Sequence, residues 1–132
     1  TEYYLRALEH LDPIDGPCWV VGDDEMFVGF ACTWLAARGI RAEPAPSFEG
    51  SRGRADLALL AGARTVVMSN STFCWWGVAA GDTEPGVARR IIVPAPWSST
   101  ASPDPTGQPG LVAGITTSNW TRVASAFGSG PG

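Results

Sequence analysis

Apolar residues recur along the chain in two patterns: short continuous runs, which predict buried strands, and longer runs with helical spacing, which predict helices. Strands are expected over 18–21, 40–43, 65–68 and 90–93, the last ending at Pro94. Helices are expected over 2–11, from 22–25 to about Arg38, and over 56–62, 73–80 and 118–127. Stretches rich in Pro, Gly and Ser predict loops over 44–54 and 98–110. This alternation predicts an α/β fold, a Rossmann-like parallel sheet with helices on both faces.

Three segments with distinctive residues follow the ends of predicted strands. They are Gly22–Asp24, Asn70–Thr72 and Pro94–Trp97. The carboxyl ends of parallel strands meet at one edge of a sheet, and ligands of such proteins bind beyond that edge. The coincidence of the three segments therefore predicts a binding site there, although no single one of them would.

The turn Asn70-Ser71-Thr72 has the composition of an anion-binding site. It lies between an apolar run that ends at Met68 and the predicted helix 73–80. The first N–H groups of a helix have no acceptor within it, and two hydroxyl groups stand beside them here. No acidic residue occurs in this first turn, so the helix dipole has no anion of its own. A plain helix cap is the alternative that the local sequence leaves open.

Length, charge and cysteine content describe one globular domain. The chain has 132 residues and a formal net charge of −4, which argues against a nucleic-acid-binding or membrane-surface role. One domain is expected over 1–127, followed by a flexible Gly/Ser/Pro tail over 128–132. No apolar run reaches the roughly 20 residues of a membrane-spanning helix, so a cytoplasmic protein is expected. Three cysteines without a C-x-x-C pair predict free thiols and no metal site.

The segment Ser69–Gly77, Ser-Asn-Ser-Thr-Phe-Cys-Trp-Trp-Gly, resembles the NSTFSWWGA motif of the α-1,2-fucosyltransferases, glycosyltransferase family 11. Shorter motifs agree in order: Tyr3-Tyr4 with Ala7, Val20–Asp24, Asp56–Leu60, Ile92–Trp97 and Trp120–Val123. The resemblance covers nearly the whole chain and implies the nucleotide-sugar half of a GT-B-like enzyme. Such an enzyme transfers fucose from GDP-fucose to the 2-hydroxyl of a galactoside, with inversion and without a metal or other cofactor.

The resemblance implies that the turn after the third strand holds the β-phosphate of GDP-fucose. Asn70, Ser71 and Thr72, with the backbone N–H groups near Phe73, would be the donors. Negative charge grows on this phosphate as GDP leaves, and fixed donors at a helix start stabilise it without a cation.

Three acidic residues are implicated in the same way. Asp56 would accept hydrogen bonds from guanine, a pairing that discriminates against other bases. Asp23 and Asp24 would hold ribose or sugar hydroxyl groups, or position basic groups of the site. Each has an alternative: Asp56 as the cap of its own helix, and Asp23 and Asp24 as acids in the first turn of a helix.

One part of the family pattern is missing. The HxRRGDY motif, whose arginine grips the β-phosphate, lies upstream of the Tyr-Tyr helix in the family, as does the acceptor-binding region. The pair Arg89-Arg90 stands in the wrong context to replace it. We therefore expect a partial domain, either a fragment of a longer enzyme or a remnant without turnover, and no catalytic base is identified. An edge strand left unpaired would favour self-association.

Four further residues have competing interpretations. Trp75 and Trp76 are expected to pack behind the phosphate turn, with a sugar-stacking platform as the alternative. Cys74 beside a phosphate site is a candidate for a lowered pKa, although a nucleophilic role is not expected. His10 near a helix end is expected to cap carbonyl groups.

Overall fold

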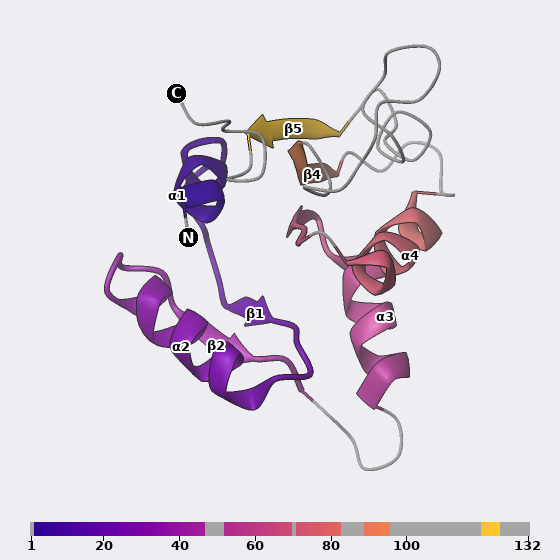
Figure 1. Cartoon of the computed structure of the whole chain (residues 1–132), viewed down its shortest axis with the longest axis horizontal. Helices are drawn as coiled ribbons and strands as arrows, with labels where there is room; N and C mark the ends of the chain where they lie inside the picture. The colour runs from indigo at the N-terminus through magenta and orange to yellow at the C-terminus, as the bar shows by residue number, and fades with distance from the viewer. Residues whose placement is uncertain (1, 47–51, 70, 83–88, 96–119, 125–132) are drawn as a thin grey trace, which may run out of the picture. The chain divides into compact units, whose positions relative to one another are not determined.

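The computed structural model describes residues 2–46, 52–69, 71–82, 89–95 and 120–124. Its elements in chain order are α1 (Glu2–Glu9), β1 (Cys18–Val20), α2 (Glu25–Ala36), β2 (Ala42–Pro44), α3 (Arg52–Gly62), β3 (Thr65–Val67), α4 (Thr72–Gly81), β4 (Arg90–Ala95) and β5 (Thr121–Ala124) (Figure 1). All paired strands are parallel, which confirms the α/β class. The predicted loop 98–110 and tail 128–132 lie outside the described residues. No helix within the described ranges is long and apolar enough to cross a membrane.

The chain forms two compact units, each with its own small sheet. The β1–β2 unit comprises residues 11–58, and the β3–β5 unit comprises residues 1–10 and 59–132. The boundary between the units falls within α3, so Asp56 belongs to the first and Leu60 to the second.

In the β1–β2 unit, α2 connects two parallel strands whose register places Cys18 opposite Ala42. Helix α2 packs closely on the end of β1, because a Cβ atom at Gly22 would lie only 3.0 Å from Cγ2 of the buried Val28. Beyond the helix, Gly39 adopts φ +77°, a conformation that glycine reaches without steric cost, and the chain returns to β2.

In the β3–β5 unit, the sheet has the order β3-β4-β5. Side chains alternate between the two faces of a strand, so Ile91 and Val93 share one face and Ile92 points to the other. The first face packs against α3 and α4 in a buried apolar cluster: Leu60, Val66, Met68, Val78, Ile91, Val93 and Trp120. Removal of this apolar surface from water is the main force that stabilises the unit.

Helix α1 packs on the opposite side of the same sheet and lies beside β5 (Figure 1). Its buried Tyr3 donates a hydrogen bond to the carbonyl oxygen of Met68 (2.6 Å), just after β3. At the other end of α1, Nη1 of Arg90 donates to the carbonyl oxygen of His10 (2.8 Å). The helix therefore runs antiparallel to the strands. His10 accepts this bond through its backbone carbonyl group, and the expected capping of carbonyl groups by its side chain stays a prediction.

The prediction of a helix over 118–127 is wrong, because residues 121–124 form β5. This strand pairs with β4, with Ile92 opposite Thr121 and Pro94 opposite Val123. The β-branched Thr121 and Val123 fit a pleated strand. The local preferences for helix and for strand are both weak in this segment, so the backbone hydrogen bonds to β4 decide that it forms a strand.

Two predicted element boundaries also differ. Helix α3 begins at Arg52, so Asp56 lies inside it and does not cap its start. Strand β4 continues through Pro94 to Ala95. Proline lacks the N–H group of a ladder hydrogen bond, but pairing with β3 ends at Ile92, and beyond it β4 pairs with β5.

Candidate functional site

The β3–α4 turn lies at the carboxyl end of a parallel strand, where the sequence predicted an anion site. Ser71 is the N-cap of α4: its backbone is extended, and its Oγ accepts a hydrogen bond from the N–H of Cys74 (3.4 Å). The first turn of α4 contains no acidic residue, and Phe73 within it is exposed. The capping interpretation of Ser71 is thus confirmed. Asn70 and the side chain of Thr72 lie outside the described residues.

Two tyrosines of α1 lie near this turn. The rings of Tyr3 and Tyr4 are in contact, with centroids 4.9 Å apart. Burial, followed by the neighbouring Tyr4 and Cys74, raises the pKa of Tyr3 well above its usual value of 10.0. Burial and then Cys74 also raise the pKa of Tyr4. The sequence assigned no site role to these phenols, although Tyr3-Tyr4 with Ala7 was among the motifs that resemble the fucosyltransferase family.

The thiol of Cys74 is neutral at pH 7. Burial raises its pKa to about 11, although a backbone hydrogen bond with Ser69 acts in the opposite direction. The alternative of a lowered pKa is therefore wrong, because desolvation of the thiolate outweighs the effect of the helix start. A nucleophilic role is disfavoured for the same reason.

The two tyrosines and Cys74 thus form a neutral, partly buried environment near the amino terminus of α4, which is the positive end of the helix dipole. The phenols and the thiol carry no charge at pH 7, so they do not repel an anion. The Ser71 hydroxyl oxygen accepts a hydrogen bond from one N–H group of α4, and the hydroxyl can donate a hydrogen bond to a ligand. The arrangement is chemically suited to hold an anionic oxygen.

The acidic candidates lie in the β1–β2 unit. Asp24 is the N-cap of α2, and its Oδ1 accepts from the N–H groups of Met26 (3.0 Å) and Phe27 (3.2 Å). Its neighbour Asp23 is exposed in the β1–α2 turn. Asp56 is buried within α3, with 7% of its surface exposed. The helix-start interpretation is confirmed for Asp24, and the capping alternative is wrong for Asp56.

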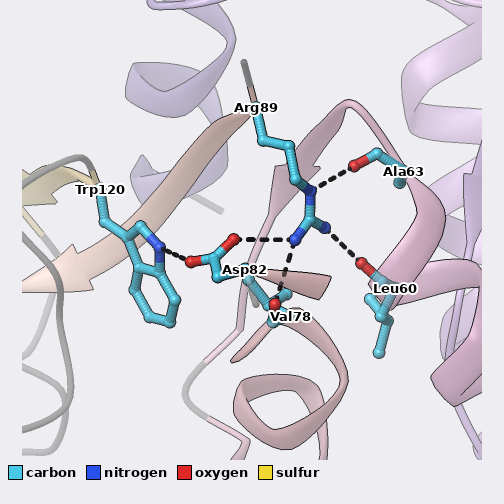
Figure 2. Close-up of polar contacts among 6 residues, drawn as sticks. All are labelled: Leu60, Ala63, Val78, Asp82, Arg89 and Trp120. Carbon is cyan, nitrogen blue, oxygen red and sulfur yellow. Dashed lines mark hydrogen bonds and ion pairs between the residues drawn. The ribbon is translucent and has the colours of Figure 1, made fainter. Parts of the chain in front are cut away.

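Arg89 has a structural role at the opposite edge of the β3–β5 sheet (Figure 2). Its guanidinium donates to the carbonyl oxygens of Leu60 (2.6 Å), Ala63 (2.8 Å) and Val78 (3.1 Å). It also pairs with Asp82 (2.9 Å), and its side chain is only 6% exposed. These contacts close the carboxyl ends of α3 and α4, where a cation is favoured. The Arg89 side chain therefore makes its hydrogen bonds at the amino ends of the strands, away from the β3–α4 turn.

Asp82 links this arginine to the last strand. Its second oxygen, Oδ2, accepts a hydrogen bond from Nε1 of Trp120 (2.6 Å), as Figure 2 shows. The preceding Gly81 has no room for a side chain, since a Cβ atom would lie 2.2 Å from the carbonyl oxygen of Ala61. The sequence contained no periodic or spacing signal for this network, whose members meet only in the folded chain.

The two adjacent tryptophans differ in environment. Trp75 is partly buried against the apolar cluster, which confirms its packing role. Trp76 contacts the Trp75 ring edge-on, with centroids 4.9 Å apart, but 65% of its surface is exposed. The packing prediction is therefore wrong for Trp76, because successive residues of a helix point in different directions.

Comparison of the chain with models of known protein families, with curated proteins and with solved structures found no match. The comparisons assign no family. Among the described residues, no group of three or more His, Cys, Asp or Glu side chains is arranged to hold a metal ion. The three cysteines are free thiols, as predicted. Interpretation of the site therefore depends on the geometry above and on the local motifs.

Proposed function

We propose that this chain is the GDP-fucose-binding part of an inverting, metal-independent glycosyltransferase that transfers fucose to the 2-hydroxyl of a galactoside. The proposal includes the finer fold, a Rossmann-like domain that forms the nucleotide-sugar half of a GT-B-like enzyme. The observation that carries it is the start of α4. There Ser71 caps a helix without an acid in its first turn, shortly after the parallel strand β3 and within the segment 69–77 that resembles the fucosyltransferase motif.

The chemistry of this turn supports a role at the phosphate end of the donor. As GDP leaves, charge develops on its β-phosphate, and donors already fixed by the fold stabilise that charge with little reorganisation. Ser71 and Thr72, with the N–H groups of the α4 start near Phe73 and with Asn70, would supply these donors. The neutral Cys74 thiol adds no opposing charge.

The acidic residues of the β1–β2 unit would recognise the guanine base and the sugar hydroxyl groups of the donor. Asp56, which is buried, would accept hydrogen bonds from the N–H groups of the guanine edge, a pairing that other bases reproduce only in part. Asp23, exposed beside the cap of α2, would bind ribose or sugar hydroxyl groups. Asp24 keeps its capping bonds and would contribute its second oxygen.

A domain that binds nucleotides without turnover is the second candidate. The observation that favours it is the engagement of the Arg89-Arg90 pair, since both side chains donate to backbone carbonyl groups. Loss of a charged donor to the transferred group costs on the order of 10²–10³ in rate. We therefore expect nucleotide binding by the 132-residue chain, but no measurable transfer of fucose to lactose by this chain alone.

Isothermal titration with GDP, ADP and UDP tests the donor site. We expect GDP to bind most tightly, Thr72→Ala to weaken all three nucleotides, and Asp56→Asn to weaken GDP selectively. Thr33→Ala and Asp15→Ala are matched controls, because both residues are exposed and lie outside the proposed contacts.

The outcomes separate the parts of the proposal. Equal affinity for the three nucleotides would remove the guanine role of Asp56, whereas absence of binding to any of them would remove the donor site itself. Robust fucosylation of lactose by the purified chain would contradict the binding-only candidate.

A further inference from the structure

Helix α2 has an apolar outer face. Its 12 residues include one charged side chain, Glu25, whereas a helix on a protein surface usually carries polar residues on the side away from its sheet. Three large apolar side chains are exposed instead: Met26 by 84%, Phe30 by 61% and Phe27 by 50%. A helix that is apolar on all sides is normally buried on all sides, so this face is expected to contact a partner.

The centre of this face is a stripe of exposed residues, called here the α2 stripe: Met26, Phe30, Thr33 and Ala37. Their spacings of four, three and four residues place them on one side of the helix. The Thr33 hydroxyl donates a hydrogen bond to the carbonyl oxygen of Gly29 (3.1 Å). Because this bond uses the hydroxyl proton inside the helix, Thr33 can present its methyl group to an apolar partner.

The α2 stripe has large side chains in its first half and small ones in its second half. If two copies of the helix pack antiparallel about a two-fold axis between Phe30 and Thr33, Phe30 lies opposite the partner's Thr33. Met26 then lies opposite the partner's Ala37. A large side chain meets a small one at each of these contacts, which lets the two helices interlock without voids. A parallel pairing would set two phenylalanines against each other and leave a gap at the small residues.

The charges at the two ends of α2 favour the same antiparallel arrangement. Asp23, Asp24 and Glu25 are exposed at the start of the helix, and Arg38 is exposed just beyond its end. Antiparallel pairing brings the acidic end of one copy to the basic end of the other and aligns the two helix dipoles in opposite directions. An isologous dimer requires a face that complements itself after a two-fold rotation, and both the sizes and the charges along α2 do so.

We propose that α2 is the interface of a weak, reversible homodimer in which two copies of the helix pack antiparallel through the α2 stripe. At roughly 200 Å² for each large side chain, the exposed parts of Met26, Phe27 and Phe30 amount to roughly 400 Å² per copy. Two copies would bury somewhat more than about 800 Å² in total, which is the range of transient complexes. The α2 stripe contains no residue of the proposed nucleotide site, so the inference is independent of that function.

Sedimentation equilibrium of the full chain tests the dimer. Every sample carries Ala124→Lys, because the outer strand β5 offers a separate surface for association. We expect the mass to rise from that of a monomer toward that of a dimer between about 10 µM and about 1 mM. Phe30→Glu and Thr33→Lys should each raise the dissociation constant by at least about tenfold. Ala36→Lys, on the flank of the same helix, should leave it unchanged, because charged residues are tolerated beside a helix seam.

A mixture of two variants tests the antiparallel register. In an antiparallel dimer the carboxylate introduced by Phe30→Glu lies opposite the ammonium group introduced by Thr33→Lys. An equimolar mixture should therefore form a heterodimer at concentrations where each variant alone is monomeric, whereas a parallel dimer would not bring the two charges together. Met26→Glu mixed with Ala37→Lys repeats the test at the second contact, and far-UV circular dichroism checks that each variant is folded.

Three outcomes would overturn the proposal. The first is a chain with Ala124→Lys alone that stays monomeric up to about 1 mM, which would show that something other than a second copy covers this face. The second is a dimer that Phe30→Glu and Met26→Glu leave intact. The third is a pair of mixtures that both remain monomeric.

Discussion

At the scale of single residues, the buried side chain of Arg89 joins the ends of two helices and Asp82. A guanidinium carries five N–H donors in a planar fork, and here four hydrogen bonds use them on three helix-end carbonyl groups and Asp82. A buried cation is costly unless it is paired and hydrogen-bonded. The network in Figure 2 meets this requirement and joins α3, α4 and, through Trp120, the start of β5.

Substitution of Arg89 should destabilise the β3–β5 unit strongly. We expect Arg89→Ala to lower the free energy of unfolding by about 3 kcal/mol, because it leaves buried carbonyl groups and Asp82 without their partner. Arg89→Lys should recover only part of this loss, since an ammonium group cannot match the planar fork. Urea denaturation measures both variants, with the exposed Arg64→Ala as control. A loss below about 1 kcal/mol for Arg89→Ala would contradict the structural role.

Tyr3 should make stability fall at alkaline pH. Its pKa is raised in the folded protein, chiefly by burial, so it stays protonated where an unfolded tyrosine ionises. Above pH 10 the unfolded state therefore binds fewer protons, and the free energy of unfolding declines by up to about 1.4 kcal/mol per pH unit for this group. Below pH 10 its contribution is fully present.

Tyr3→Phe tests this linkage. The variant should show a shallower decline above pH 10 in urea titrations, and should lose about 1 kcal/mol at pH 7 with the hydrogen bond to Met68. Tyr4→Phe and the double variant of both tyrosines measure how much the Tyr4 phenol contributes to the alkaline decline in the free energy of unfolding. An unchanged slope in Tyr3→Phe would show that another group controls the alkaline transition.

At the scale of elements, the connections from β1 to α2 and from β3 to α4 each end in a capping residue. Asp24 caps α2 with two hydrogen bonds, and Ser71 caps α4 with one. A capping side chain satisfies N–H groups that have no acceptor within the helix, and an acid also interacts favourably with the helix dipole. The same geometry that starts each helix places its capping side chain beyond the carboxyl end of the preceding strand of its own unit.

Adjacent aspartates allow a controlled test of the cap. Asp24→Ala should destabilise the β1–β2 unit by about 1 kcal/mol, whereas Asp23→Ala should change its stability by less than about 0.5 kcal/mol. Hydrogen exchange in α2 measures the effect locally, with Asp24→Asn as the variant that keeps a capping oxygen. Equal effects of the two alanine variants would show that net charge, and not the cap, stabilises the helix start.

At the scale of the whole molecule, the short strands make two small sheets, and each sheet ends in outer strands. In the β3–β5 sheet, β5 pairs with β4 alone among the described strands. Outer strands present backbone groups that can pair with another chain. The modest net charge of −4 provides only limited repulsion between copies.

We predict concentration-dependent self-association through such an edge. Light scattering after size-exclusion chromatography should show species larger than a monomer as concentration rises. Ala124→Lys, at an exposed position of β5, should reduce association, because a lysine on an edge strand disfavours pairing. Ala36→Lys, at the exposed end of α2, is the charge-matched control. A clean monomer at high concentration would contradict the prediction.

Local sequence determined the elements whose signals are complete within a few residues. The apolar run before Ser69 specified β3, Asp24 and Ser71 specified helix starts, and the alternation of strands and helices specified the α/β class. These features depend on periodicity and on side chains that bond their own backbone, so they are visible without neighbours. The anion-binding composition of the β3–α4 turn was visible in the same way.

Tertiary structure alone decided the rest. Residues 121–124 became β5 because β4 offered a partner, and the roles of Asp82 and Arg89 emerged only where two helix ends and Trp120 meet. Burial raised the pKa of Cys74, although its position at a helix start suggested the opposite. Hydrogen-bond partners and desolvation depend on segments distant in sequence, and a local pattern holds no information about them.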